Sequence, residues 1–498
     1  MALSESMLWR LQREYYERCG VEAWASGCVP YWITCNPRIA RQFAAVVSAW
    51  VLESPELDLA EPVTLVELGG GTGMFASRFL RALEELAPPA LRFRYVLTDA
   101  SEAAVTTWRS HEALAPWLAS GRLELACFDP VQQDRLTLHP SGVVLGPGEL
   151  ANPLVAIANY FLDSIPIDVF RVSGGRLHEG RATLTADPGR AGPPTGEHLA
   201  TLDLSYDWAP LDDARYEDPR LQRLLALYAA KIGGVVSIPV GAIRALDHVT
   251  ALSGGRALIL VADKGGTSLG QLGVPASAWP ARHGSVSFWT NLHALGVVFE
   301  DQGGGSVFNE PGDDLAVGAL WCGHPVLPAT ELMFRTLTGL QGPGGLLPLL
   351  RRGVVSPTAE SFLALLRESG WDPLVVRQLY DEVAETLGEA GPELKWRLAR
   401  AAHRAWREYF HLPSPVDIPF KLGSLLYRVG DFEGARALYE ASLRLHGPHP
   451  VTFHDLGLCE LHLDRMPQAL RAFEQALAVE PDFGPAMEWH AEVSARLG

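Results

Sequence analysis

The segment VTLVELGGGTGMFASRFLRAL, residues 63–83, restricts the fold more than any other part of the chain. Its first six residues form an apolar run typical of a buried strand, and its last ten place apolar side chains at helical spacing. A strand that turns through glycines into a helix presents bare backbone N–H groups and the positive end of the helix dipole, which suits a small, partly anionic ligand. Four glycines join the two parts: Gly69, Gly70, Gly71 and Gly73.

Apolar, strand-like runs alternate with helical patterns from residue 62 to about 265. The runs are VTLVEL, FRYVLT, RLELACF, LVAIANYF and ALILVAD. This alternation predicts an α/β fold, with a mostly parallel, Rossmann-like sheet and helices on both faces. Residues 170–200 interrupt it with a hairpin whose turn is Gly174-Gly175, followed by a Gly/Pro-rich loop. Residues 1–58 have helical patterns and predict an N-terminal helical segment.

The C-terminal part repeats with a period of 34 residues, 422 to 456. The period and the small and aromatic positions resemble the tetratricopeptide repeat, which predicts an all-α domain. Two such units are fewer than the roughly three needed for stability, so we expect the helices of 356–412 to stack on them and the segment from residue 484 to cap them. The repeated positions are Leu422-Gly423, Ala435 and Tyr439 in the first unit, and Leu456-Gly457, Ala469 and Phe473 in the second.

These patterns divide the chain into four regions. We expect an N-terminal helical segment at 1–58, an α/β domain at 59–340 with a hairpin insertion near 170–200, a helical connector at 356–412 and the repeats at 415–498. The stretch GLQGPGGLLP, residues 339–348, is a candidate hinge. In the connector, Ser356-Pro357 and Asp372-Pro373 each predict a helix start, because each places a capping residue before a proline.

Composition excludes several classes of protein. No apolar run reaches the roughly 18 residues of a membrane span, and the first twenty residues carry charges where an export signal needs an apolar core. The six cysteines are scattered with no CxxC pair, which predicts no disulfide framework, no metal site and a cytoplasmic location. The net charge of −17 disfavours nucleic acid as a partner.

The glycine loop fails the dinucleotide-binding fingerprint G-x-G-x-x-G, because the sixth position is Met74. The spacing Glu67-x-Gly69-x-Gly71-x-Gly73 instead resembles the first motif of class I S-adenosylmethionine-dependent methyltransferases. The resemblance implies S-adenosyl-L-methionine as cofactor, with the glycines admitting its methionine end and Glu67 orienting its ammonium group.

The resemblance extends to the next two strands. Asp99 ends FRYVLTD, where an acidic side chain accepts hydrogen bonds from the ribose hydroxyls, and Asp129 ends LELACFD, where such enzymes place a group near the adenine. Acidic residues at the ends of consecutive strands favour this interpretation over a glycine turn with no ligand.

A narrower resemblance lies in AIANYFLDSIPIDVFRVSGGRLHEG. It is similar to the fourth-strand region of the MidA family, bacterial and mitochondrial methyltransferases of which the mitochondrial members assist assembly of respiratory complex I. Tyr160 stands where that family has Glu. The resemblance covers about residues 10–310, so the repeats lie outside the family's usual extent. The matching positions are Ala158, Asn159, Asp163, Pro166 and Phe170.

The methyl acceptor is expected beyond the carboxyl end of the fourth strand, next to the cofactor crevice. Three catalytic candidates follow: Asn159 as a hydrogen-bond partner of the acceptor, Tyr160 as a wall of the site, and Asp163 as the partner of a cation or, alternatively, as a helix cap. Phe161 is a second wall residue. His283, Asn291 and His293 are further candidates for a pocket.

The resemblance implies protein arginine methylation. A guanidinium is always charged and must be held by carboxylates, for which Asp163, Asp168 and Asp263 are available. Tyr160 in place of the family's Glu weakens the arginine assignment and leaves methyl transfer intact.

Three hypotheses follow. The first is a methyltransferase acting on a protein or peptide that the repeats dock, since such repeats present a groove to polypeptides. The second is a small-molecule methyltransferase whose repeats serve assembly, for instance of a homodimer. The third is a non-catalytic, cofactor-binding scaffold.

Overall fold

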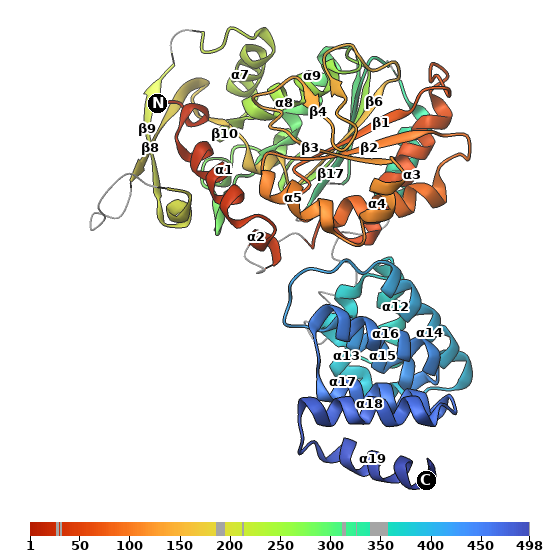
Figure 1. The fold of residues 1–498 in the computed structure, drawn as a ribbon. Coiled ribbons are helices and arrows are strands. Elements are labelled where there is room, and N and C mark those ends of the chain that lie inside the picture. The colour runs from red at the N-terminus through yellow and green to blue at the C-terminus, as the bar shows by residue number, and fades with distance from the viewer. Residues whose placement is uncertain are drawn as a thin grey trace. The chain divides into compact units, whose positions relative to one another are not determined.

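The computed structural model describes residues 1–25, 29, 32–185, 195–211, 214–310, 315–324, 326–338 and 357–497 (Figure 1). The chain divides into two compact units, Met1–Cys35 with Ile39–Pro343 and Asn36–Arg38 with Gly344–Gly498. The hinge expected at 339–348 lies outside the described residues. None of the helices in the described ranges is long and apolar enough to cross a membrane.

A seven-stranded sheet forms the centre of the first unit (Figure 1). Its strand order is β16-β17-β11-β6-β1-β2-β3; the five strands from β11 to β3 are parallel, and β17 pairs antiparallel with both of its neighbours. The five runs expected from the sequence are these parallel strands, which confirms the predicted sheet. The bounds are β1 Val63–Leu68, β2 Phe93–Asp99, β3 Leu123–Cys127, β6 Leu154–Asn159, β11 Ala257–Asp263, β16 Gly305–Phe308 and β17 Ala316–Cys322.

The central strands are buried on both faces, which explains why they are continuous apolar runs rather than alternating ones. Every residue of β1, β6 and β11 is buried. Helices of the first unit pack against the sheet (Figure 1). They are α3 Pro37–Glu53, α4 Met74–Leu86, α5 Glu102–Ser110, α6 Ala115–Ala119, α8 Val240–Ala251, α9 Leu292–Asp301 and α10 Pro328–Thr338, while α7 Pro219–Lys231 packs against α9.

The strand order reverses between β1 and β6, and this reversal places the site. At such a point the connections leave in opposite directions, so a crevice opens beyond the carboxyl ends of the strands. The glycine loop follows β1, Asp99 ends β2 and Asn159 ends β6. Residues distant in the sequence therefore meet at one edge of the sheet.

A second, antiparallel sheet has the order β10-β7-β8-β9. The hairpin turn predicted at Gly174-Gly175 is present, with positive φ angles of 56° and 74°. The sheet shares an apolar cluster with the N-terminal helix α1, Leu8–Cys19, which is followed by α2, Glu22–Ala25. The strands are β7 Asp168–Ser173, β8 Arg176–Thr185, β9 Asp203–Pro210 and β10 Gly234–Ile238.

Short elements complete the first unit near the site. The turn η2, Leu162–Ser164, follows β6, and the two-stranded hairpin of β13, Ala281–His283, and β14, Ser285–Ser287, follows β11 along the chain. The remaining short strands are β4 Leu136–Thr137, β5 Val144–Leu145, β12 Gly265–Gly266 and β15 Thr290–Asn291.

The second unit is helical, as the repeats predict. In both repeats a glycine packs closely against an aromatic ring of the next helix. A Cβ on Gly423 would lie 3.0 Å from Tyr439, and one on Gly457 would lie 2.5 Å from Phe473. The helices are α12 Ala359–Glu368, α13 Pro373–Leu387, α14 Pro392–Arg407, α15 Ile418–Val429, α16 Phe432–His446, α17 Pro450–His462, α18 Met466–Val479 and α19 Gly484–Leu497.

The connector helices share one apolar core with the first repeat. Asp372 caps α13 as predicted, accepting a hydrogen bond from the Leu374 N–H. The other predicted start is wrong by two residues: Thr358 caps α12 through a reciprocal bond with Ser361. A Thr-x-x-Ser pair satisfies two backbone groups at once, which a single Ser before proline does not. Ser356 itself lies outside the described residues.

Candidate functional site

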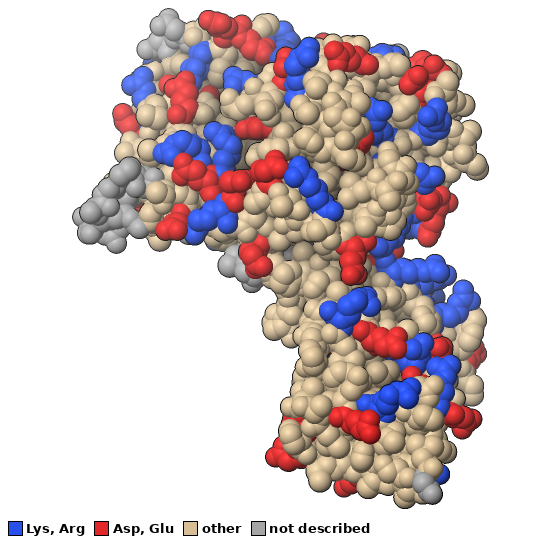
Figure 2. Space-filling model, in the orientation of Figure 1, with Lys and Arg blue, Asp and Glu red and all other residues tan. Residues whose placement is uncertain are grey.

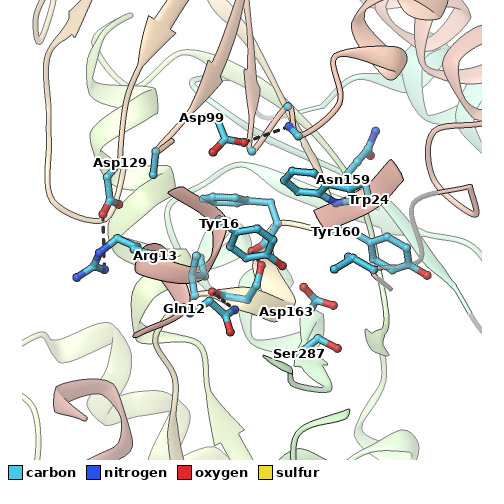
Figure 3. A pocket seen from close by; sticks show the side chains of 18 of the residues that line it. Gln12, Arg13, Tyr16, Trp24, Asp99, Asp129, Asn159, Tyr160, Asp163 and Ser287 are labelled. Atoms are coloured by element: carbon cyan, nitrogen blue, oxygen red, sulfur yellow. Dashed lines mark hydrogen bonds and ion pairs between the residues drawn. The ribbon is translucent and has the colours of Figure 1, made fainter. Parts of the chain in front are cut away.

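A cavity of about 140 Å³ opens at the carboxyl ends of β1, β2 and β6 (Figure 3). Of the residues expected to hold a cofactor, all but Gly73 line it: Glu67, Gly69, Gly71, Asp99 and Asp129. The three catalytic candidates also line it: Asn159, Tyr160 and Asp163. The cavity therefore brings together side chains from four consecutive parallel strands and their loops.

Three residues of the glycine loop have positive φ angles, a backbone conformation that is strained for residues other than glycine. Gly69, Gly71 and Gly73 have φ angles of 64°, 52° and 77°. A Cβ on Gly71 would lie 3.1 Å from the ring of Trp24, and one on Gly69 would lie 2.9 Å from Phe161. Gly73 does not line the cavity; it is the N-cap of α4 and lies against Trp108.

Glu67 lies on the cavity wall at the end of a buried strand. The Tyr95 hydroxyl donates a 2.6 Å hydrogen bond to its Oε2. Burial raises the pKa of Glu67 to about 8, because the low-polarity surroundings disfavour the charged form. A cation bound in the cavity would offset that cost and favour the carboxylate.

Asp99 is tied to the glycine loop. The Gly71 N–H donates to its Oδ2 at 3.1 Å and the Ser101 N–H donates to its Oδ1 at 3.0 Å. Burial raises the pKa of Asp99 to about 6, although these two hydrogen bonds lower it. Each oxygen has a second lone pair, so the carboxylate can still accept hydrogen bonds from a ligand in the cavity.

Asp129 follows β3 and faces the N-terminal helix. Its Oδ1 accepts a 3.0 Å hydrogen bond from the Val131 N–H, and its Oδ2 lies 3.7 Å from the Arg13 guanidinium (Figure 3). This partly exposed ion pair contributes little to stability. It does mark the point where α1 meets the rim of the cavity.

The helices α1 and α2 cover the cavity, which sequence reasoning did not predict. The Gln12 side chain donates to the carbonyl oxygens of Ser164 and Val286 at 3.1 and 2.9 Å, and the Val286 N–H donates back to it. Tyr16 stacks on Trp24 with ring centroids 5.2 Å apart. A buried Gln among the apolar positions of an amphipathic helix is the signal that indicates such a contact.

Asn159 carries an unsatisfied amide at the end of β6. Its side chain is only 7% exposed, and both Oδ1 and Nδ2 are buried with no hydrogen-bond partner in the described part of the chain. An unpaired buried polar group costs about 1–3 kcal/mol. A group that lines a cavity and lacks partners is therefore placed to bond a ligand.

Tyr160 continues from Asn159 with a φ of 46°, a left-handed conformation that is uncommon for residues other than glycine. Its N–H donates to the Ala262 carbonyl of the neighbouring strand at 2.9 Å. The Lys264 ammonium lies 5.6 Å from the centroid of its ring. The strained turn directs the chain from β6 into η2 and exposes the ring to the cavity.

Asp163 lies inside the turn η2, whose first flanking residue is Phe161, so Asp163 is not a helix cap. Its carboxyl group is buried, and the nearby hydroxyls of Ser164 and Ser287 favour its charged form. Burial raises the pKa of Asp163 to about 7, and the positive charge of Lys264 opposes that shift.

Asp263, the neighbouring acid, is engaged by the backbone. It accepts hydrogen bonds from the N–H groups of Leu162, Asp163 and Lys264 at 2.8–3.1 Å. Burial and the nearby Asp163 raise the pKa of Asp263. This carboxylate shapes the turn that carries Asp163 and does not line the cavity.

Three predicted residues lie elsewhere. Asp168 bonds the Tyr216 hydroxyl at 2.8 Å and the Ser4 N–H at 3.0 Å in the second sheet. Asn291 caps α9 through the Ala294 N–H, and His293 contacts the Tyr228 hydroxyl. These hydrogen bonds give Asp168, Asn291 and His293 structural roles. Of the three pocket candidates, His283, Asn291 and His293, only His283 lines the cavity. Among the described residues, no group of three or more metal-ligating side chains is placed to hold an ion.

Residues 38–260 match the family described as "putative S-adenosyl-L-methionine-dependent methyltransferase", and residues 417–480 match the tetratricopeptide repeat. Comparison with curated proteins found no match.

Several solved structures are similar. An uncharacterized protein from Burkholderia thailandensis is 16% identical with a TM-score of 0.42, and the alignment covers 69% of this chain and 90% of that one. A second protein of the same superfamily and organism, described as a candidate methyl transferase bound to S-adenosyl-homocysteine, is 16% identical with a TM-score of 0.38 and coverage of 57% and 78%. MamA from Desulfovibrio magneticus RS-1 is 18% identical with a TM-score of 0.23 and coverage of 30% and 80%.

The family match spans the glycine loop, Asp99, Asn159 and Asp163, and the repeat match spans α15 to α18. The chain therefore contains a region, residues 38–260, that matches this family of S-adenosyl-L-methionine-dependent methyltransferases, and it carries tetratricopeptide repeats in its C-terminal part.

Proposed function

We propose that the chain methylates a nitrogen of a polypeptide, and that arginine is the first acceptor to test. The observation that carries the proposal is the pair of buried polar side chains at the acceptor end of the cavity. The Asn159 amide lacks partners in the described part of the chain, and the Asp163 carboxyl is buried on the same connection from β6. Together they offer hydrogen-bond acceptors and a donor to a group that bears N–H.

The residues of the cavity suit S-adenosyl-L-methionine, which supplies an electrophilic methyl group when bound. Glu67 would pair with its ammonium group, the N–H groups of the glycine loop would meet its carboxylate, and Asp99 would accept from its ribose hydroxyls. Asp129 would lie toward the adenine. The ring of Trp24 lies against the glycine loop at Gly71, and the ring of Tyr16 stacks on it.

The part of the cavity proposed for the methyl acceptor offers one carboxylate. It therefore favours an acceptor that bears N–H and that is either neutral or paired with this single carboxylate. Asp163 is the available acid, because Asp263 is bonded to three backbone N–H groups. Lys264 lies against the Tyr160 ring and acts electrostatically on Asp163, so its positive charge opposes binding of a second fixed cation. A guanidinium must therefore enter with Asp163 fully ionised.

The second unit would recruit the polypeptide, and its connector helix α14, which precedes the repeats, offers a charged face for it. Arg400 lies 4.8 Å from the ring centroid of Trp396, which is 59% exposed, and His403 of the same face lies 2.7 Å from the Asp431 carboxylate. Blue side chains gather on the part of the unit where α14 lies (Figures 1 and 2). Its exposed residues recur every three or four positions: Glu393, Trp396, Arg397, Arg400, His403, Arg404 and Arg407. An acidic segment of the substrate matches this face.

Replacing Asp163 by Asn tests the acceptor assignment. The change keeps the shape and one acceptor oxygen but removes the charge. For an arginine acceptor we expect turnover to fall about a hundredfold or more, as when a preorganised transition-state contact is lost. S-adenosyl-homocysteine affinity, measured by calorimetry, should barely change. Asp168→Asn is the matched control, a buried acid outside the cavity.

A turnover of Asp163→Asn near that of the wild type, with the ligand still bound, would exclude arginine. That result favours the second candidate function, a small-molecule methyltransferase whose repeats serve assembly.

A further inference from the structure

Lys264 brings a positive charge to the cavity without an anion of its own. Its side chain is half-buried and lines the cavity. In the described part of the chain, the ammonium group has no hydrogen bond or ion pair; its contact is the Tyr160 ring, whose centroid lies 5.6 Å away. Taking a charge out of water is costly unless the charge is paired, so a bound anion would offset that cost.

The charged residues at the cofactor end of the cavity differ from this lysine, because they have partners within the protein. Asp129 lies 3.7 Å from the Arg13 guanidinium. Glu67 accepts a hydrogen bond from a tyrosine hydroxyl, and Asp99 accepts hydrogen bonds from two backbone N–H groups. Among the described residues that line the cavity, the lysine is therefore the cation that has no anion, and no ion pair joins it to Asp163.

The backbone of Lys264 is held at the carboxyl end of β11. Its N–H donates a 2.8 Å hydrogen bond to Asp263 Oδ1, and its carbonyl oxygen accepts a 2.9 Å bond from the Thr290 N–H. In the sheet, β11 pairs with β6 so that Ala262 lies opposite Asn159. The lysine side chain therefore starts from a fixed point one strand away from the residues proposed to meet the methyl acceptor.

The strand order separates Lys264 from the cofactor residues. Glu67 and the glycine loop lie at the end of β1, Asp99 ends β2 and Asp129 follows β3. The order β11-β6-β1-β2-β3 places β6 between the lysine and all of these groups. An anion bound by the lysine would therefore belong to the acceptor rather than to the methionine end of the cofactor.

We propose that Lys264 binds a carboxylate of the methyl-accepting polypeptide, so that the chain selects an acceptor nitrogen with an acidic residue beside it. The inference rests on the proposed function and names its substrate class. With the carboxylate bound, the charge of the lysine no longer opposes a cation at Asp163. The two side chains then hold a cation and a neighbouring anion through charge-assisted hydrogen bonds.

The first test measures binding and needs no turnover. The probes are two capped pentapeptides, Gly-Glu-Arg-Glu-Gly and Gly-Gln-Arg-Gln-Gly, titrated by calorimetry into the full chain loaded with S-adenosyl-homocysteine. We expect wild type to bind the glutamate peptide about tenfold or more tightly than the glutamine peptide, as a hydrogen bond between charged groups implies. Lys264→Gln should bind both alike. Lys231→Gln, an exposed change on α7, should keep the preference.

Both peptides are compared within one variant, so any effect of the substitution on Asp163 cancels in the ratio. A preference that survives in Lys264→Gln overturns the proposal. Equal affinities in wild type, or binding of neither peptide, also overturn it.

Charge reversal separates recognition from a structural role. Lys264→Glu should prefer the capped peptide Gly-Lys-Arg-Lys-Gly to the glutamate peptide, a result that a lysine kept only for packing would not give. The affinity of Lys264→Gln for S-adenosyl-homocysteine should equal that of wild type. If that affinity falls tenfold or more, the lysine holds the carboxylate of the cofactor and the proposal is wrong.

Turnover separates the carboxylate site from the function beneath it. If wild type methylates no polypeptide but the glutamate preference depends on Lys264, the proposed activity is wrong and the carboxylate site stands. If methyl transfer occurs, KM for the glutamate peptide should rise in Lys264→Gln to the value for the glutamine peptide. Transfer by wild type with the same KM for both peptides would leave the proposed function standing and the carboxylate site wrong.

Discussion

The cavity differs from the apolar core around it because it is lined by buried polar residues. Glu67, Asp99, Asn159 and Asp163 are each less than a tenth exposed. Burial of such groups is costly unless something pairs with them. Asp99 has backbone partners and Glu67 has Tyr95, whereas the Asn159 amide has none in the described structure. The unpaired group therefore lies at the cavity where we propose that the ligands bind.

Gly71→Val should abolish binding of S-adenosyl-homocysteine. The residue has a φ of 52°, and even its Cβ would lie 3.1 Å from the Trp24 ring, so the branched side chain occupies the space over the loop. Calorimetry measures the loss. Gly233→Ala is the matched control, since nothing lies within 4 Å of its Cβ. Binding of normal strength by Gly71→Val would contradict the assignment of the loop.

Glu67→Gln should stabilise the ligand-free chain more at pH 9 than at pH 6. Burial raises the pKa of Glu67 to about 8 from the ordinary value of 4.5. The neutral form of Glu67 therefore makes its full contribution to the free energy of unfolding below about pH 4.5, and this contribution is lost as the pH rises through 8. Gln has no proton to lose. Thermal unfolding of both proteins at both pH values gives the difference; an equal effect at pH 6 and pH 9 contradicts it.

At the scale of elements, the sequence predicted what local periodicity encodes. The five parallel strands, the glycine loop, the Gly174-Gly175 hairpin and the glycine–aromatic spacing of the repeats are local patterns, and all are present. The cover formed by α1 was not predicted, because its contacts through Gln12 join residues 152 and 274 positions apart. For the same reason the distant partners of Asp168 and His293 were missed.

Gln12→Leu should loosen this cover. It leaves the Val286 N–H and the carbonyl oxygens of Ser164 and Val286 without their partner, and one such buried group costs about 1–3 kcal/mol. We expect the free energy of unfolding, measured with urea, to fall by at least that much. Glu17→Ala, an exposed change on the same helix, should stay within about 0.5 kcal/mol of wild type. Equal stability of Gln12→Leu and wild type would mean that α1 does not hold the cavity closed.

At the scale of the molecule, the chain combines two units with separate apolar cores. The sheet unit has its core around β1, β6 and β11, and the helical unit has a core that runs from α12 into the repeats. Separate cores allow each unit to fold and bind by itself. The residues that we propose to hold the cofactor all belong to the first unit.

A chain ended after Thr338 should keep S-adenosyl-homocysteine affinity and lose activity on the polypeptide. At low substrate concentration we expect a loss of about tenfold or more, because a docked substrate has a raised effective concentration at the cavity. Charge reversal at Arg397 and Arg400 in the full chain should reproduce part of the loss. Equal rates with and without residues 339–498 would leave the repeats with an assembly role only.

The account is tested most directly by incubating a cell lysate with the full chain and S-adenosyl-L-methionine labelled in its methyl group, then locating the label by mass spectrometry. The account predicts label on a nitrogen of a protein with wild type, none with Gly71→Val, and about a hundredfold less with Asp163→Asn. Label confined to small molecules would contradict the polypeptide acceptor. No transfer by a wild-type chain that binds the cofactor in the presence of the lysate would contradict the account as a whole.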